Sequence, residues 1–139
     1  MNQVIANLWA NALENPKFKQ TTGNLVKETR SGGHTFCATG VLCHILAAAG
    51  YLKRVKRNGI LGYVDAGGRF SATGIPGGGL AAAGLTNPTI AVVGGVKVRA
   101  RRGNHPATIS ALNDVGVTGD AWTFKSLAKL IRRRHAQLI

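Results

Sequence analysis

The chain of 139 residues is 45% hydrophobic and carries 18 Lys and Arg against 5 Asp and Glu, a formal net charge of +13. This length and apolar content fit one domain with its own hydrophobic core, residues 1–139. The sequence contains no uninterrupted run of about 18 apolar residues, which excludes a transmembrane helix. No basic segment precedes the first apolar residues, as it would in a signal peptide, so we expect a cytoplasmic protein that has no membrane partner.

The positive charge predicts a polyanionic partner. A field of this sign attracts nucleic acid, nucleotides and acidic protein surfaces, and it raises the rate at which they associate. Like charges repel one another in the compact state, so this excess is costly without a counter-charge. The alternative is a basic surface that only keeps the protein soluble.

The first predicted element is an amphipathic helix over residues 2–14, followed by Pro16. Its apolar residues recur with helical spacing: Val4, Ile5, Leu8, Trp9, Ala12 and Leu13. Residues 35–51 are nearly all apolar and predict a second, largely buried helix that ends at Gly50. Gly40 lies inside this helix at a cost in helix stability, which indicates that it allows close packing.

The middle of the chain predicts short strands and turns. Residues 59–72 form two strands around the turn Asp65–Gly68, and residues 74–85 are a glycine-rich segment that leads into a short helix. Two β-branched runs in residues 89–101 predict a β-hairpin whose turn is Gly94–Gly95.

The C-terminal part of the chain returns to helices. Residues 108–116 predict a short helical piece, and residues 123–139 predict a last helix that Thr123 caps. The apolar stripe of this last helix is Phe124, Leu127, Ala128 and Ile131. Because helices come first and last and strands lie between them, we predict an α+β fold, with N- and C-terminal helices packed on a short antiparallel sheet and hairpins.

The positive charge is concentrated in three segments, which together form the predicted polyanion-binding site. Their members are Lys53, Arg54, Lys56 and Arg57; Lys97, Arg99, Arg101 and Arg102; and Arg132, Arg133 and Arg134. In the second segment a strand would place three cations on one face about 7 Å apart, close to the spacing of phosphates along one nucleic-acid strand. In the last helix the cations fall opposite the apolar stripe, on a face that is solvated in any fold.

Aromatic residues are only 6% of the chain, which argues against a surface that stacks bases. Trp9 and Phe124 have the spacing of core residues, and only Tyr51, Tyr63 and Phe70 lie near basic residues in the sequence. We therefore expect nucleic-acid binding that is mainly electrostatic and that weakens with salt.

Both cysteines lie in the second predicted helix with histidines beside them, in the order His34, Cys37, Cys43, His44. The six residues from Cys37 to Cys43 turn a helix by about 240°, so the two sulfur atoms diverge and favour neither a zinc site nor a disulfide. We predict that both cysteines pack in the core, with a metal site or a cysteine nucleophile as the alternative.

No other segment carries a clear catalytic pattern. The backbone N–H groups of residues 77–79 could bind a phosphate ahead of a helix, but no Lys-Ser/Thr follows them as in a Walker motif. The carboxylates have no spacing that suggests general acid–base catalysis, and His105 lacks an evident partner. The sequence therefore predicts a protein that is not an enzyme and that holds no metal or cofactor.

Four segments occur in order and cover most of the chain: LWANALENPKFKQTTGNL, FCATGVLCHIL, IPGGGLAAAGLTNP and LNDVGVTGDAWTFKSLAKLI. Together they resemble the blocks of a family of small proteins encoded by tailed bacteriophages and prophages. The sequence departs from the family pattern at Ala38 and Thr39, where a second Cys and a Leu are usual, and in its last helix, which is basic where relatives are more acidic. The family has no established activity, so the resemblance implies phage origin and not a mechanism.

These patterns together predict a small basic phage accessory protein that binds nucleic acid or a nucleotide in the host cytoplasm. A host-modulating or defence-modulating role belongs to this class. The alternative is a virion component, a minor capsid or cement protein whose charge faces packaged DNA or an acidic shell surface. Such a protein would act as a homo-oligomer or within the virion assembly.

Overall fold

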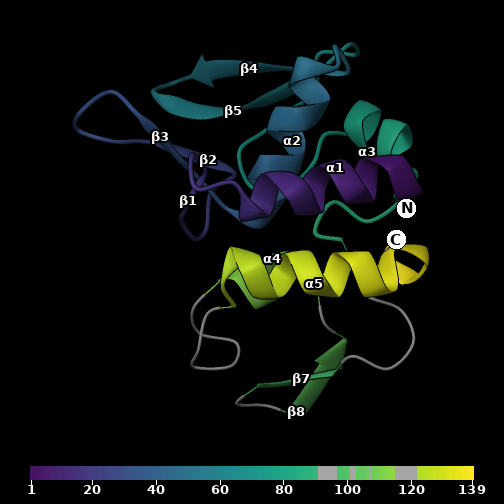
Figure 1. Ribbon diagram of the computed structural model, residues 1–139. Coiled ribbons are helices and arrows are strands. Elements are labelled where there is room, and N and C mark those ends of the chain that lie inside the picture. Colours follow the sequence, from purple (N-terminus) through teal and green to yellow (C-terminus); the bar gives the residue numbers. More distant parts are fainter. Residues whose placement is uncertain (91–96, 101–102, 107, 115–121) are drawn as a thin grey trace.

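The computed structural model describes residues 1–90, 97–100, 103–106, 108–114 and 122–139, and for 97–100 and 103–106 it describes the backbone. Its helices are α1 (Gln3–Glu14), α2 (Ala38–Ala48), α3 (Gly77–Ala83), α4 (Ile109–Asn113), α5 (Phe124–Arg134) and the short 3-10 helix η1 (His135–Gln137). Its strands are β1 (Lys19–Gln20), β2 (Val26–Glu28), β3 (His34–Phe36), β4 (Leu52–Arg57), β5 (Ile60–Asp65), β6 (Phe70–Ser71), β7 (Lys97–Ala100) and β8 (Gly103–Pro106). The fold is α+β, as predicted (Figure 1).

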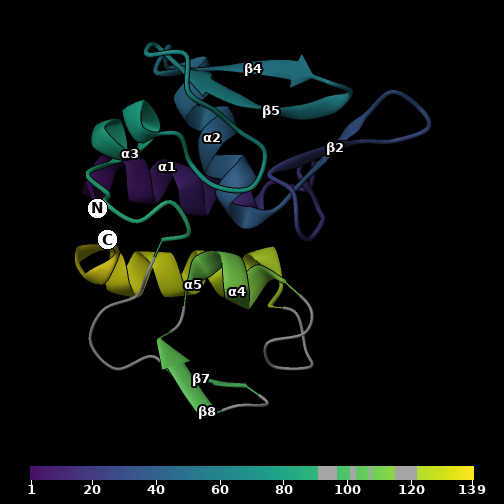
Figure 2. The same ribbon diagram turned by 180° about the vertical axis from the view of Figure 1, so that it is seen from behind.

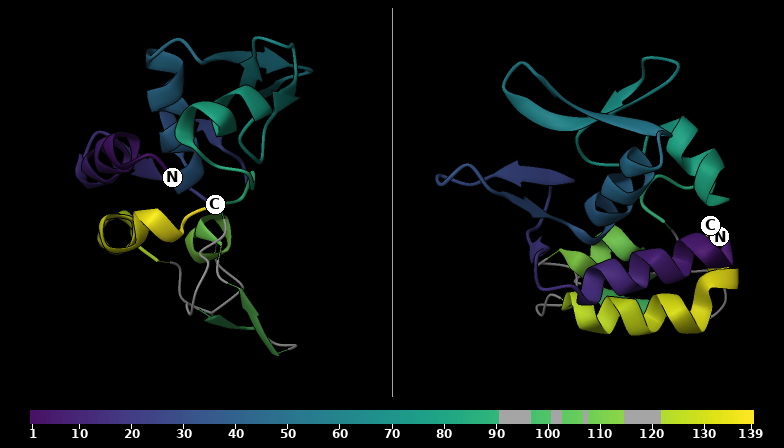
Figure 3. Two further views of the ribbon diagram at one scale, coloured as in Figure 1. Left: turned by 90° about the vertical axis from the view of Figure 1, so that its right-hand side faces the viewer. Right: turned by 45° about the horizontal axis from the view of Figure 1, so that its top comes forward.

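Two antiparallel helices from opposite ends of the sequence form the middle of the molecule. α1 and α5 lie side by side, with both chain termini at the same end of the pair (Figures 1 and 3). The ammonium group of Met1 donates a hydrogen bond of 3.0 Å to the carbonyl oxygen of Leu138, which holds these termini together. The β4–β5 hairpin lies on the other side of α2 from this helix pair (Figure 1). Among the described residues, no helix is both long and apolar enough to cross a membrane.

α1 forms where it was predicted, but its buried face only partly matches the predicted apolar residues. The side chain of Asn2 caps the helix by accepting from the backbone N–H groups of Val4 and Ile5. The buried residues are Ala6, Trp9, Ala10 and Leu13. Of the apolar residues that predicted the helix, Trp9 and Leu13 are buried, whereas Val4 is 67% and Leu8 is 51% exposed. The small residues Ala6 and Ala10, which the predicted apolar set omitted, are buried beside Trp9 where α1 packs against α5 and α2.

α2 begins three residues later than predicted, because His34–Phe36 form strand β3. The thiol of Cys37 caps the helix and accepts from the backbone N–H of Gly40 at 3.3 Å. A Cβ atom on Gly40 would overlap the backbone carbonyl of Leu25, so the predicted close packing is confirmed. Gly50 has φ +87° immediately after the helix, the left-handed conformation expected of a glycine that ends a helix.

Two three-stranded sheets flank α2, with strand orders β1-β3-β2 and β4-β5-β6. The predicted strands around the Asp65–Gly68 turn are confirmed as β5 and β6, but β4 was not predicted. β4 and β5 are joined by Asn58–Gly59, which have φ values of +50° and +79° and so form the tight turn that favours this dipeptide. The backbone N–H of Leu25 donates to the carbonyl of Ala72 at 2.8 Å and links the two sheets.

The basic strand β7 pairs forward in the chain with β8, with Lys97 opposite Pro106 and Arg99 opposite Asn104. The predicted hairpin placed its partner on the N-terminal side, across Gly94–Gly95, and that turn lies outside the described residues. The strand itself is confirmed, and the connection to β8 runs through residues 101–102, which also lie outside the described part.

α5 agrees with the sequence prediction in its cap and in its buried face. The hydroxyl of Thr123 accepts from the backbone N–H of Ser126 at 3.2 Å. The buried residues are the four predicted ones, Phe124, Leu127, Ala128 and Ile131. This stripe packs against α1, so the two terminal helices share one hydrophobic core.

Candidate nucleic-acid interface

The three basic segments do not come together on one surface. The hairpin β4–β5 lies at one end of the molecule, the hairpin β7–β8 lies at the opposite end, and α5 lies between them (Figures 1 and 2). Each segment is therefore a separate candidate site.

The segment on β7 is described only through its backbone. The register places Lys97 and Arg99 two residues apart on one strand, and side chains at that spacing share a face of the hairpin. Arg101 and Arg102 lie outside the described residues. The predicted row of cations on this strand stays a prediction.

The segment on α5 is partly used to hold the fold together. The guanidinium of Arg132 donates to both carboxylate oxygens of Glu14 at 2.7 Å and to the side-chain oxygen of Asn11 at 2.8 Å. The hydrogen bonds between Arg132 and Glu14 lower the pKa of Glu14 and raise that of Arg132. Arg134 donates to the side chain of Gln137 at 3.1 Å, and Arg133 is exposed on the face opposite the buried stripe. Arg132 thus ties α5 to α1.

The segment on β4 is divided between the two faces of the sheet. Lys56 pairs with Glu28 of β2 at 2.8 Å, and its hydrogen bond lowers the pKa of that carboxyl. Arg54 lies opposite the buried Tyr63, on the same face as Lys56. Lys53 and Arg57 are exposed on the other face, which we call the outer face of the β4–β5–β6 sheet. By the strand register, the outer face consists of Lys53, Val55, Arg57, Ile60, Gly62, Val64 and Phe70.

The outer face combines cations with an aromatic ring. Lys53, Val64 and Phe70 form one row across the three strands. The Phe70 ring lies over Gly62, where a Cβ atom would come within 2.6 Å of two ring carbons. The guanidinium carbon of Arg57 lies 5.2 Å from the centre of the same ring, a cation–π contact. Only glycine at position 62 leaves room for this arrangement, so the ring and Arg57 are held on the sheet.

The described carboxylates all have internal partners. Glu14, Glu28 and Asp65 form ion pairs with Arg132, Lys56 and Arg69, in that order. The carboxylate of Asp114 accepts from the backbone N–H of Gly23 at 3.0 Å. None of these four acidic residues belongs to the outer face, so Lys53 and Arg57 have no acidic neighbour among its residues.

The glycine-rich first turn of α3 already binds an anion, the carboxylate side chain of Asp65. One carboxylate oxygen of Asp65 accepts from the backbone N–H of Gly78 at 3.0 Å. Arg69 donates to the same carboxylate from its backbone N–H and from its guanidinium. The hydrogen bond from Gly78, followed by that from the Arg69 backbone, lowers the pKa of Asp65. Two of the three backbone N–H groups that the alternative phosphate site would use are thus occupied, Gly78 by Asp65 and Gly79 by the carbonyl of Pro76.

We predict that Asp65→Asn lowers stability at neutral pH and flattens the acid limb of the stability curve. The pKa of Asp65 is below its ordinary value of 3.8 in the folded protein, so the carboxylate stabilises the fold above that pH. This contribution is lost as the pH falls from the ordinary value through the folded one. Urea unfolding midpoints of both proteins, measured at neutral pH and at about pH 2, should converge in acid. A constant difference between them at all pH values would contradict the prediction.

The Cys37–His44 segment is part of the core. Both thiols are buried and unbonded to each other, and burial raises the pKa of Cys37 to about 11 and that of Cys43 well above its ordinary value. The ring centres of His34 and His44 lie 6.5 and 5.5 Å from that of Phe36. Burial lowers the pKa of His44, and the positive charges of nearby Arg54 and Lys17 add to this effect.

The core assignment of both cysteines is confirmed. Within the described part of the chain, no three His, Cys, Asp or Glu side chains come together in a way that could hold a metal ion.

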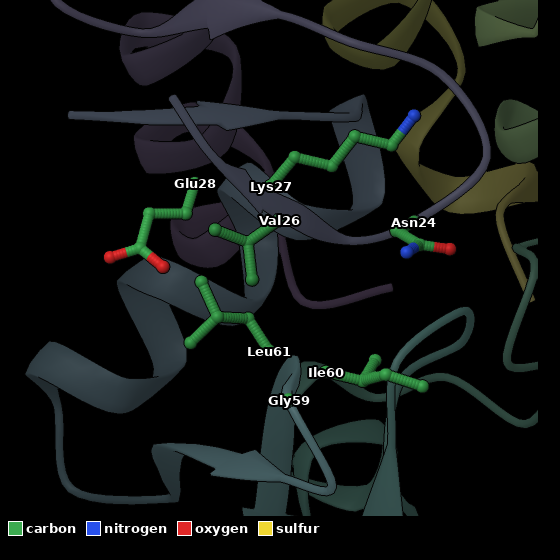
Figure 4. A pocket seen from close by; sticks show the side chains of 7 residues that line it. All are labelled: Asn24, Val26, Lys27, Glu28, Gly59, Ile60 and Leu61. Carbon is green, nitrogen blue, oxygen red and sulfur yellow. The ribbon is translucent and has the colours of Figure 1, made fainter. Parts of the chain in front are cut away.

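A groove of about 330 Å³ lies between β2 and the tip of the β4–β5 hairpin (Figure 4). Its lining residues are Asn24, Val26, Lys27, Glu28, Gly59, Ile60 and Leu61. Glu28 is the acidic member of this lining, and it is already paired with Lys56. The groove therefore offers one lysine and an apolar wall, but no acid–base pair for catalysis.

No protein-family model, no curated protein and no solved structure matches the chain. The resemblance to phage-encoded proteins stays a prediction, and the function has to be inferred from the residues themselves.

Proposed function

We propose that the protein binds nucleic acid through the phosphate backbone, with the outer face of the β4–β5–β6 sheet as a contact surface. The observation that carries the proposal is the composition of this face, which contains Lys53 and Arg57 and no acidic residue. Both side chains are exposed, and the ion pairs among the described residues do not include them. Their charge is therefore available to a partner, as the net charge of +13 also favours.

The shape of the surface favours an extended polyanion over a single nucleotide. Lys53 and Arg57 are four residues apart on one strand, which corresponds to about 13 Å. Phosphates along one nucleic-acid strand can meet both cations, whereas a mononucleotide needs a concave site that encloses it.

We predict that Lys53→Glu combined with Arg57→Glu weakens the binding of a fluorescein-labelled 20-nucleotide DNA by more than about tenfold at low salt. Removing two phosphate contacts should also reduce the slope of log K against log salt by about 1.4, since each contact to a single strand contributes about 0.7. Fluorescence anisotropy titrations at several salt concentrations measure both quantities.

A charge-matched control is Lys125→Glu combined with Lys129→Glu, on the exposed face of α5. It changes the net charge by the same amount, so it should weaken binding less and leave the salt slope nearly unchanged. The pair Arg99→Glu and Arg101→Glu tests the predicted row of cations on β7. Equal losses in all three variants would mean that overall charge and not the outer face is responsible. Absence of binding by the unmodified protein would overturn the proposal.

A further inference from the structure

Aromatic groups lie at the outer face, although the low aromatic content of the sequence argued against a surface that stacks bases. Phe70 is part of it, and Tyr51 stands immediately before β4 with 52% of its surface exposed. We propose that this face binds single-stranded nucleic acid, with unpaired bases stacking on Tyr51 and on the Arg57–Phe70 pair while Lys53 holds a phosphate between them. This inference rests on the proposed function and names the form of nucleic acid.

The Arg57–Phe70 pair is a preformed stacking surface. Its ring is held against Gly62, and its guanidinium is held within 5.2 Å of the ring centre. Bases stack on guanidinium planes as well as on aromatic rings. Because both groups already contact each other on the sheet, little side-chain freedom is lost when a base is added.

Tyr51 is the complementary position at the other end of β4. Its backbone N–H donates to the carbonyl of Leu46 at 2.9 Å, which fixes the chain where α2 leads into the strand. Tyr51 and Lys53 are two positions apart, about 7 Å along an extended chain. An isolated exposed aromatic residue is ordinary on protein surfaces. Tyr51 differs from such a residue in its position next to a lysine of the outer face, in line with a second aromatic group.

The spacing fits a short stretch of single strand. Lys53 and Phe70 lie on strands separated by one other strand, about 10 Å apart, and Lys53 and Arg57 are about 13 Å apart. Tyr51 and Arg57 are six positions apart along the strand, about 20 Å. At about 7 Å per phosphate this length corresponds to roughly four nucleotides, the lower end of the site size of single-strand-binding domains. In a duplex the faces of the bases are covered by their neighbours, so neither aromatic group could stack on them.

The test compares three probes by anisotropy or by competition: fluorescein-labelled dT12, a labelled 12-base-pair duplex, and inorganic polyphosphate, which has no bases. The variants are Tyr51→Ala and Tyr51→Phe. Tyr51→Ala should weaken dT12 binding about fivefold or more and leave the duplex and polyphosphate within about twofold of the unmodified protein. Tyr51→Phe keeps the ring and should bind dT12 as the unmodified protein does.

Two results would overturn the inference while leaving the proposed function intact. One is binding of the duplex as tight as that of dT12, and the other is an equal loss for all three probes in Tyr51→Ala. If the unmodified protein binds none of the three probes, the proposed function itself is wrong. Because Tyr51 is exposed, loss of folding does not confuse these outcomes.

Discussion

Gly40→Ala should lower the free energy of unfolding by about 3 kcal/mol or more. In an open helix the same substitution would raise stability by about 1 kcal/mol, because alanine is the better helix former. Here the added methyl group would overlap the carbonyl oxygen and carbon of Leu25, both of them backbone atoms. A backbone cannot rotate away as a long side chain can, so either α2 or the segment before β2 has to shift. The steric cost therefore exceeds the gain in helix propensity.

The matched control is Gly33→Ala, the same substitution at a position where the atom nearest to the new methyl group is the side-chain hydroxyl oxygen of Thr29, at 3.2 Å. That hydroxyl can move, so the control should change stability by no more than about 0.5 kcal/mol. Urea denaturation followed by the fluorescence of the buried Trp9 reports both variants. Equal midpoints for Gly40→Ala and the unmodified protein would show that the contact with Leu25 is looser than the structure has it.

Gly40 also shows how far a sequence can predict a contact. A glycine in an apolar helix is costly, so the need for close approach could be predicted from the sequence alone. The residue that Gly40 contacts could not be predicted, since Leu25 is fifteen positions away and its backbone carbonyl leaves no pattern in the sequence. The same limit explains α1, where periodicity identified the helix but could not show that Trp9 is buried while Val4 and Leu8 are exposed. Periodicity reports which residues share a face, and the small alanines that decide the packing weigh little in it.

The candidate site was predictable in part. The basic residues of β4 were identified by their charge. Their division between two faces could be predicted only if this segment was known to be a strand, and the run of charged residues hid the alternating pattern of a strand. The Asn58–Gly59 dipeptide between two runs is a hairpin signal that could have revealed it. The contact of Arg57 with Phe70 depends on the register of three strands. The hydrogen bond from Gly78 to Asp65 depends on how the turn after β5 packs against α3. Such long-range pairings follow from tertiary packing, which local patterns do not encode.

The buried polar side chain of Asn113 connects three parts of the fold. It is fully buried at the end of α4. Its side-chain oxygen accepts from the backbone N–H of Ala38 at 3.1 Å and from the side chain of Gln20 at 3.0 Å. Its side-chain nitrogen donates to the carbonyl of Thr21 at 2.9 Å. The side-chain amide of Asn113 therefore provides hydrogen-bond partners for polar groups at the start of α2 and around β1 at the same time.

Asn113→Ala should lower the free energy of unfolding by roughly 3–5 kcal/mol, because each buried group left without a partner costs about 1–3 kcal/mol. The control is Asn24→Ala, which shortens a half-buried asparagine at the groove and should cost no more than about 0.5 kcal/mol. Urea denaturation gives both values, and amide hydrogen exchange gives a local readout. If Asn113 holds the start of α2, the backbone amide of Ala38 should exchange faster in Asn113→Ala even under conditions that keep the protein folded. A large loss of stability with unchanged protection at Ala38 would instead assign the effect to the cavity left by the side chain. Loss of the hydrogen bond exposes the Ala38 amide to exchange, whereas a cavity lowers the stability of the whole fold without freeing this particular amide.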